Sequence, residues 1–259
     1  MTIQIPNTFR QKILAKQTLI GFWMNMSSHI TAELAGLIGF DWLLLDGEHS
    51  PNEVPMFLNQ LQALSASGSA AVGRPPANDP VIIKRFLDIG FYNLLIPFIE
   101  SREEAERAVA ATRYPPQGMR GVSGSTRANG FGATKEFFAA VNDNITVLLQ
   151  IESQKGIDAV DEIAAVSGVD GIFIGPSDLA ASLGHIGDPN HPQVQKVIKH
   201  LHARSVAAGK AVGILAPGKD DAQRYLDMGM HFVAVGVDLS LFKQSMAALQ
   251  QHFHHYVQR

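Results

Sequence analysis

The sequence predicts a (β/α)₈ barrel, and two observations lead to that prediction. Short runs of branched and aromatic apolar residues, each of strand length, alternate with longer helical stretches along the whole chain. These runs number eight, and no linker or change of composition divides the 259 residues. We therefore expect residues 1–259 to form one barrel domain with its functional side chains at the carboxyl ends of the strands. The main alternative is an open doubly wound sheet, but its usual G-x-G-x-x-G turn does not follow the first strand.

The expected strands are the apolar runs that stop abruptly at a turn-forming or charged residue: 19–23, 42–46, 70–73, 93–96, 145–151, 171–174, 211–215 and 232–235. Helix signals frame the stretches between them. Ser28 is a capping residue, Pro80 and Pro192 fit a first helical turn, and Ser101 with Glu104 forms a capping box. The expected helices are 29–38, 53–66, 79–89, 101–112, 134–141, 153–166, 191–208, 220–228 and 239–256.

One connection is long. Residues 114–132 are rich in Gly, Pro and Ser and include Arg120 and Arg127. A segment of that length without regular structure is uncommon inside a compact domain unless it has a function. We expect it to be a lid or a substrate-binding loop.

Composition narrows the function classes. A net charge of -3 and a pI near 6.3 give no basic face for nucleic acid or an anionic membrane. The absence of cysteine excludes disulfides, thiolate catalysis and sulfur-ligated metals. No apolar run approaches the roughly 20 residues that cross a bilayer, and the first residues do not have the order of a signal peptide. We expect a cytoplasmic enzyme that acts on a small molecule.

Carboxylates end two of the expected strands. Glu152 follows the fifth strand, and Asp178 follows the sixth, beside Ser177. Two carboxylates with few other ligands suit a hydrated divalent cation such as Mg²⁺ or Mn²⁺, which keeps positions open for substrate oxygens. Each acid alone could instead be solvated or cap a helix. Gln150 lies two residues before Glu152, so we expect its amide on the same strand face, where it could contact substrate or bond to the backbone.

The second and third strands end in ionisable groups of other kinds. His49 directly follows the buried run Leu43–Asp46, which makes it a candidate general base, and an acid should raise its basicity. Asp46 and Asp88 are the two candidates for that acid. Arg74 ends the third strand and could bind a substrate carboxylate or stabilise an enolate oxygen, or it could sit in an ordinary ion pair.

Other catalytic signatures do not fit. The sequence contains no H-E-x-x-H and no Walker loop, and Gly121-Val122-Ser123-Gly124-Ser125 misses the nucleophile elbow G-x-S-x-G at its last position. A Schiff-base mechanism needs a lysine in the barrel mouth, and the sixth strand has none.

Several segments together resemble the metal-dependent class II pyruvate aldolases of the HpcH/HpaI family, nearly from end to end. The segments that carry the resemblance are Gly39-Phe40-Asp41-Trp42 through Asp46-Gly47-Glu48-His49, Asn78-Asp79-Pro80 with Leu87-Asp88-Ile89-Gly90, Arg113-Tyr114-Pro115-Pro116 with Arg120-Gly121, and Gln150-Ile151-Glu152 with Gly175-Pro176-Ser177-Asp178-Leu179.

The resemblance implies a (β/α)₈ barrel whose last helix packs on a neighbouring subunit of a homohexamer. It also implies a divalent cation, Mg²⁺ or else Mn²⁺ or Co²⁺, and a role for each site residue. Those roles are Glu152 and Asp178 as metal ligands, His49 as base, Asp88 raising its basicity, Arg74 stabilising the transition state, and Gln150, Ser177 and Asp178 binding substrate. Asp46 belongs to the same motif, and we expect it to orient the loop that carries His49.

The implied reaction is the reversible retro-aldol cleavage of 2-dehydro-3-deoxy-D-glucarate, or of 5-dehydro-4-deoxy-D-glucarate, to pyruvate and tartronate semialdehyde through a metal-bound pyruvate enolate. A related aldolase acting on 4-hydroxy-2-oxoheptanedioate or another 2-keto-3-deoxy acid is the nearest alternative. More distant alternatives are a lyase for acyl-CoA thioesters, which would need a basic groove for nucleotide phosphates, and a non-catalytic binding or assembly protein.

Overall fold

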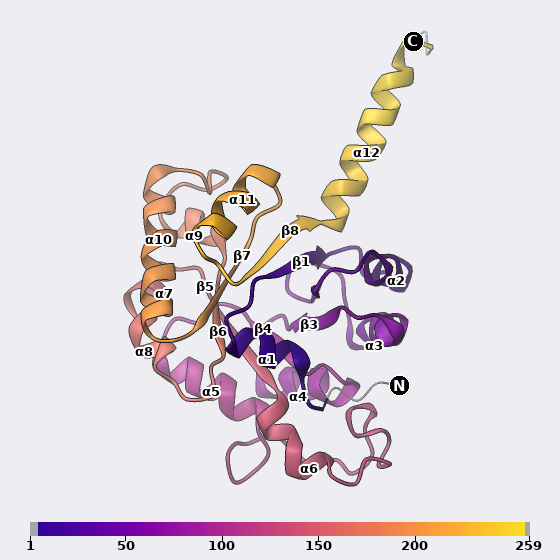
Figure 1. Cartoon of the computed structure of the whole chain (residues 1–259), viewed down its shortest axis with the longest axis vertical. Helices are drawn as coiled ribbons and strands as arrows, with labels where there is room; N and C mark the ends of the chain where they lie inside the picture. The colour runs from indigo at the N-terminus through magenta and orange to yellow at the C-terminus, as the bar shows by residue number, and fades with distance from the viewer. Residues whose placement is uncertain (1–4, 257–259) are drawn as a thin grey trace.

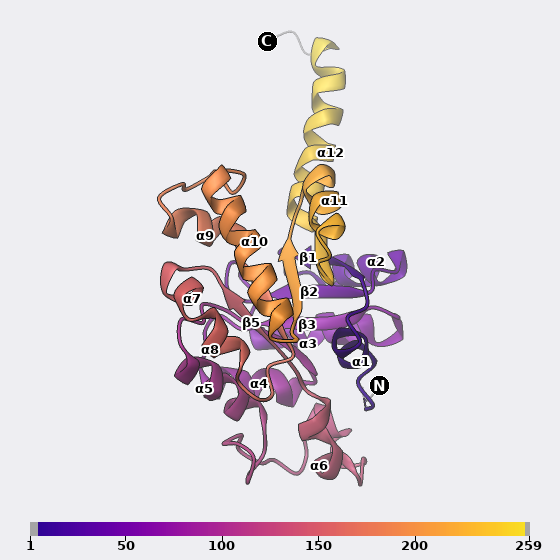
Figure 2. The same cartoon turned by 60° about the vertical axis from the view of Figure 1, so that its left-hand side comes forward.

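The computed structural model describes residues 5–256, which form a closed barrel of parallel strands in the order of the chain (Figures 1 and 2). This confirms the predicted fold class. The strands are β1 (Leu19–Met24), β2 (Trp42–Asp46), β3 (Ala70–Arg74), β4 (Asn93–Ile96), β5 (Thr146–Ile151), β6 (Gly171–Ile174), β7 (Ala211–Leu215) and β8 (Phe232–Val237). β1 pairs with β8 as well as with β2, so the sheet has no free edge.

Helices follow the strands and cover the outside of the barrel. The α-helices are α1 (Thr8–Leu14), α2 (His29–Ile38), α3 (Val54–Ala63), α4 (Pro80–Ile89), α5 (Arg102–Thr112), α6 (Phe137–Ala140), α7 (Gln154–Asp158), α8 (Val160–Ala164), α9 (Pro176–Ser182), α10 (Pro192–Ala207), α11 (Lys219–Asp227) and α12 (Asp238–Phe253). Short 3₁₀ turns are η1 (Leu64–Ala66), η2 (Arg127–Asn129), η3 (Val141–Asn144) and η4 (His254–Tyr256).

Several elements differ from the sequence prediction. The helix expected over residues 153–166 is two short helices, α7 and α8, which meet at Ala159. Helix α1 was not predicted, although Asn7 caps it by accepting a hydrogen bond from the backbone N–H of Arg10. Helix α9 begins at Pro176, where the sequence indicated only that a helix could start.

Strand β2 explains why a run of consecutive apolar residues fits this fold. Leu43 and Leu45 pack outward against the helices, while Trp42 and Leu44 belong to the cluster that fills the barrel interior. Both faces are buried, so the usual alternation of apolar and polar residues disappears. Aromatic side chains that pack against glycines fill the barrel interior. A Cβ on Gly21 would lie 2.0 Å from the Trp42 ring, and one on Gly213 would lie 2.2 Å from the Phe232 ring.

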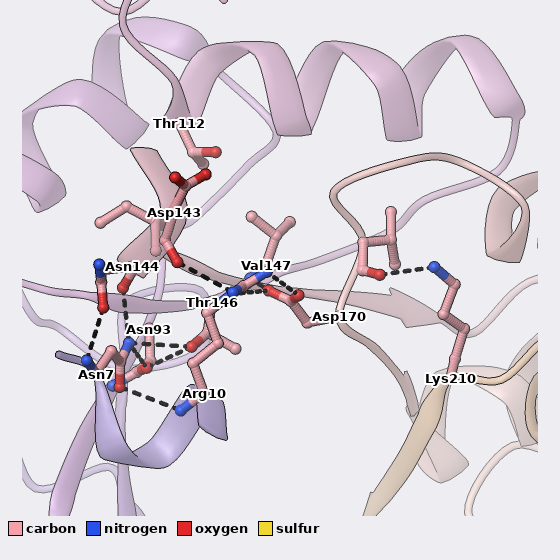
Figure 3. Close-up of polar contacts among 12 residues, drawn as sticks. Asn7, Arg10, Asn93, Thr112, Asp143, Asn144, Thr146, Val147, Asp170 and Lys210 are labelled. Atoms are coloured by element: carbon pink, nitrogen blue, oxygen red, sulfur yellow. Dashed lines mark hydrogen bonds and ion pairs between the residues drawn. The ribbon is translucent and has the colours of Figure 1, made fainter. Parts of the chain in front are cut away.

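A polar cluster fastens α1 beneath the amino ends of β4, β5 and β6 (Figure 3). The Asn7 amide donates to Asn93 Oδ1 at 2.8 Å and to Thr146 Oγ1 at 3.2 Å. Arg10 forms a two-pronged ion pair with the buried Asp170, at 2.8 and 3.1 Å. Phe9 and Ile13 on the same helix reach the interior cluster, so α1 closes this end of the barrel and leaves the carboxyl end for function.

Helix α12 does not pack along the barrel wall. It starts at the end of β8 and projects away from the body of the protein in both views (Figures 1 and 2). Apolar side chains along it are about half exposed, among them Leu241, Phe242, Met246 and Leu249. Such an apolar surface on one projecting helix is typical of a protein interface. No helix among the described residues is long and apolar enough to span a membrane.

Candidate active site

A cavity of about 160 Å³ opens at the carboxyl ends of the strands. Residues from β1, β2, β3, β5, β6, β7 and β8 or from the turns that follow them line it. The lining residues are Trp23, Asn25, Asp46, His49, Arg74, Gln150, Phe173, Gly175, Pro176, Ser177, Asp178, Leu215 and Val237. Six of the residues to which the sequence analysis gave a role therefore meet here, although up to 132 positions separate them in the chain, as Asp46 and Asp178 are separated.

Asp46 organises the turn after β2. Its Oδ1 accepts hydrogen bonds from the backbone N–H groups of Glu48 at 3.0 Å and His49 at 3.5 Å. A side chain that holds the two following amides fixes the turn in one conformation. The role predicted for Asp46, orientation of the loop that carries His49, agrees with this geometry.

Arg74 forms a buried two-pronged ion pair with the same carboxylate. Its Nε donates to Asp46 Oδ1 at 2.8 Å and its Nη2 to Oδ2 at 2.7 Å. The Trp23 indole N–H donates to Asp46 Oδ2 at 3.2 Å, and the guanidinium lies 4.8 Å from the Trp23 ring centroid. Burial alone would raise the pKa of Asp46, but the hydrogen bonds and charge of Arg74 outweigh it, so this pKa lies below its usual value.

Glu48 lies between the arginine and the histidine. Its Oε2 is 2.7 Å from Arg74 Nη1 and 4.0 Å from His49 Nε2. Burial raises the pKa of Glu48, while Arg74 and His49 act in the opposite direction. The His49 side chain is 60% exposed and lines the cavity. The sequence prediction gave Glu48 no role, although the residue stands beside His49 in the same motif.

Glu152 is buried at the other wall of the site. Its Oε1 accepts from the backbone N–H of Phe98 at 3.0 Å, and its Oε2 accepts from the Gln150 amide. Burial, together with the nearby charges of Glu48 and Asp178, raises the pKa of Glu152 to about 7 against the opposing effects of Gln150 and Arg74. The carboxyl group is therefore poised between its two protonation states near neutral pH.

Ser177 and Asp178 occupy the first turn of helix α9, where both are exposed. They line the cavity beside Gly175. That glycine is required by close approach, because a Cβ there would lie 2.3 Å from Glu152 Oε2 and 2.8 Å from the Gln150 amide nitrogen. A larger residue at position 175 would therefore displace Glu152 or Gln150.

The donor set fits a divalent cation of the hard type. The described residues contain no ready-made cluster of three or more His, Cys, Asp or Glu side chains. Two carboxylates, Glu152 and Asp178, interact electrostatically, and the buried Gln150 Oε1 beside them has no hydrogen-bond partner among the described residues. Excess negative charge and an unsatisfied oxygen suit an ion that completes its shell with water and substrate oxygens.

Asp88 does not join this group within one chain. It lies in the last turn of α4, which leads into the amino end of β4, whereas His49 follows the carboxyl end of β2. Its carboxylate is paired with Arg120 at 2.7 Å. Among the described residues neither Asp88 nor Asp46 forms an ion pair with the His49 ring, whose nearest carboxylate is that of Glu48.

The loop over residues 114–132 also lies at the amino end, because it connects α5 to β5. The Arg120 guanidinium carbon lies 4.4 Å from the centroid of the Tyr114 ring, and Arg127 donates a hydrogen bond to the backbone oxygen of Ile89 at 2.8 Å. The expectation that this loop is a lid is wrong for the chain's own cavity. Larger cavities do occur there, of about 940 Å³ beside Arg113 and Tyr114 and about 500 Å³ beside Asp88 and Arg127. Neither contains the strand-end residues.

The chain matches known proteins over almost its whole length. The family model described as HpcH/HpaI aldolase/citrate lyase matches residues 19–245. A 5-keto-4-deoxy-D-glucarate aldolase of Escherichia coli O6:H1 is 59% identical over 248 residues, which cover 96% of this chain and 97% of the relative.

Two solved structures of the same family superpose on the chain over nearly its whole length. An HpcH/HpaI aldolase/citrate lyase family protein from Burkholderia cenocepacia J2315 superposes with a TM-score of 0.92 at 40% identity, covering 95% of this chain and 98% of that one. An HpcH/HpaI aldolase from Desulfitobacterium hafniense DCB-2 superposes with a TM-score of 0.86 at 25% identity, covering 94% of this chain and 95% of that one.

Proposed function

The chain belongs to the HpcH/HpaI aldolase/citrate lyase family, and from that premise we propose that it cleaves 5-keto-4-deoxy-D-glucarate, and 2-dehydro-3-deoxy-D-glucarate, to pyruvate and tartronate semialdehyde. The observation that carries the proposal is the meeting of His49, Arg74, Gln150 and Asp178 at one cavity beside the buried Glu152. The relative named for this substrate matches almost the whole chain.

Glu152 and Asp178 are the residues that would hold a divalent cation, Mg²⁺ or else Mn²⁺ or Co²⁺. When bound, such an ion polarises the substrate's carboxylate and keto oxygens and stabilises the charge that develops as the carbon–carbon bond breaks. Gln150 and Ser177 line the same cavity and would hydrogen-bond the same keto acid, and the close packing at Gly175 holds Gln150 beside Glu152.

His49 takes the proton from the substrate hydroxyl whose carbon becomes the aldehyde. Its ring lines the cavity, and its Nε2 lies 4.0 Å from Glu48 Oε2. Arg74 is held by Asp46 and Glu48 on one side, so its orientation does not have to be selected during the reaction. It faces the pocket with a fixed positive charge for the developing enolate.

The role implied for Asp88 requires a second subunit. Within one chain Asp88 and His49 lie at opposite ends of the barrel, so only a neighbouring subunit could bring an Asp88 to this cavity. The exposed apolar side chains of α12 supply a surface for such assembly, and we propose the homohexamer implied by the family resemblance. We also propose a cytoplasmic location, where the product pyruvate enters metabolism.

The direct test measures pyruvate release from 5-keto-4-deoxy-D-glucarate and from a panel of other 2-keto-3-deoxy acids, 4-hydroxy-2-oxoheptanedioate among them. Activity should vanish with chelator and return with Mg²⁺ or Mn²⁺. His49→Ala should lower kcat by about 10²-fold or more. The matched control is His200→Ala, which removes an exposed histidine from α10. Equal rates with and without chelator, or full activity in His49→Ala, would contradict the proposal.

A further inference from the structure

The turn after β4 contains a residue in an unfavourable backbone conformation. Phe98 has a φ of 55°, in the left-handed region that residues with a Cβ seldom adopt. Its ring does not account for this conformation, because the residue is 52% exposed and its ring gains little from burial. A strained residue of this kind persists when its surroundings impose the conformation, and such residues cluster at functional sites.

The conformation of Phe98 is accompanied by two consecutive backbone hydrogen bonds to the end of β5. The N–H of Phe98 donates to Glu152 Oε1 at 3.0 Å, and the N–H of Ile99 donates to the backbone oxygen of Gln150 at 3.0 Å. In a regular strand, successive N–H groups point to opposite sides, so only one of the two could reach β5. A left-handed residue can turn both N–H groups to the same side, which is the pattern found here.

Both oxygens of the Glu152 carboxylate have a donor. Phe98 donates to Oε1, and the Gln150 amide donates to Oε2. Glu152 is 2% exposed, so water does not replace a bond that is lost. Rotation of the carboxylate would break at least one of these bonds. The direction of this side chain is therefore fixed before any ion binds.

Glu100 fastens the same turn to the residue that follows Glu152. Its Oε1 accepts from the Ser153 hydroxyl at 2.6 Å, and Ser153 Oγ in turn accepts from the N–H of Gly156 in α7 at 3.2 Å. Glu100 Oε2 lies 3.6 Å from Lys155 Nζ, but that lysine side chain is 79% exposed, so the ion pair contributes little. The hydrogen bond with Ser153 is therefore the side-chain contact through which Glu100 can act on Glu152.

We propose that the turn of residues 98–100 positions Glu152 for the divalent cation, with Glu100 holding the turn against the end of β5. Neither Phe98 nor Glu100 lines the cavity, so both are positioning residues that act through Glu152. This inference rests on the proposed function, because Glu152 is one of the two residues proposed there to hold the ion. Hydrogen-bond partners that orient a metal ligand commonly contribute about 10- to 100-fold to metal affinity.

The test measures Mn²⁺ binding to the chelator-treated protein, by titration calorimetry or by the electron paramagnetic resonance of free Mn²⁺. Glu100→Ala should raise the Kd for Mn²⁺ about tenfold, because Ser153 loses its partner. Glu100→Gln removes the charge but keeps an oxygen that accepts from Ser153, so it should retain most of the affinity. Glu103→Ala removes an exposed carboxylate from the first turn of α5, and this matched control should bind Mn²⁺ as the wild type does.

A second pair of variants tests the left-handed conformation itself. Asn adopts this conformation more readily than Phe does, whereas the β-branched Val resists it. Phe98→Asn should therefore keep the Mn²⁺ affinity of the wild type, and Phe98→Val should lower it about tenfold. The comparison excludes a contribution from the aromatic ring, because both variants lack it. Circular dichroism verifies that each variant is folded.

Equal Kd values for wild type and Glu100→Ala, or for Phe98→Asn and Phe98→Val, would overturn the positioning role. An equal loss of affinity in Glu100→Gln and Glu100→Ala would also overturn it, because the effect would then come from the charge of Glu100. These results leave the proposed function standing. A wild type that binds Mn²⁺ but releases no pyruvate contradicts the proposed substrate alone, and a wild type that binds no Mn²⁺ overturns both proposals.

Discussion

Replacing Glu152 by Gln should stabilise the metal-free protein at neutral and alkaline pH while abolishing cleavage. Glu152 is 2% exposed, and its ionised form faces Glu48 and Asp178. Gln has the same shape without the charge. Its carbonyl can still accept from the N–H of Phe98, and a flip of the Gln150 amide lets the unpartnered Gln150 Oε1 accept from the new side chain.

The magnitude follows from linkage between protonation and folding. The pKa of Glu152 rises from 4.5 to about 7 on folding. At about 1.4 kcal/mol per pH unit, this difference corresponds to about 3 kcal/mol. The folded state holds the proton more tightly, so stability falls as the pH rises from 4.5 to about 7 and then levels off. The Glu152→Gln variant does not lose stability in this way. The difference in free energy of unfolding between variant and wild type should therefore grow from pH 4.5 to about 7 and reach a few kcal/mol at pH 8.

The assay is denaturant unfolding with chelator, at equal protein concentration, for wild type and variant at several pH values between 4.5 and 8. Trp23 and Trp42 are both buried in the barrel and provide the fluorescence signal. Subtracting the free energy of unfolding of the wild type from that of the variant cancels the contributions of the other titrating groups. Glu162→Gln makes the same change at an exposed position and is the control. A Glu152→Gln free energy of unfolding equal to or below that of wild type at pH 8 would refute the reasoning.

Three other outcomes are expected. Arg74→Ala should destabilise the protein by about 3–5 kcal/mol in the same assay, because it leaves the fully buried Asp46 carboxylate without its partner; a loss below 1 kcal/mol would argue against that pairing. Gly175→Ala should reduce kcat by about 10²-fold with little loss of structure by circular dichroism, because the new Cβ displaces Glu152; unchanged kcat would mean that the displacement is harmless. Phe242→Glu on the exposed face of α12 should yield smaller assemblies in sedimentation velocity, and an unchanged sedimentation coefficient would place the interface elsewhere.

The barrel itself was predictable because its signals are local. Each strand is a run of branched apolar residues with a clear stop, and closure of eight such units brings the strand ends together without further information. The same logic correctly brought His49, Arg74 and Asp178 to one cavity. It missed α1 and joined α7 to α8, since helices of five to seven residues give too short a pattern to read.

The sequence by itself determined which residues stand at the ends of strands, because consecutive side chains show where each apolar run begins and where a charged or turn-forming residue ends it. The tertiary structure alone decided how those residues are used. Arg74 became the partner of Asp46, and Asp88 went to the opposite end of the barrel, where it pairs with Arg120. Such pairings depend on distance and burial between segments far apart in the chain, and no local pattern encodes either quantity.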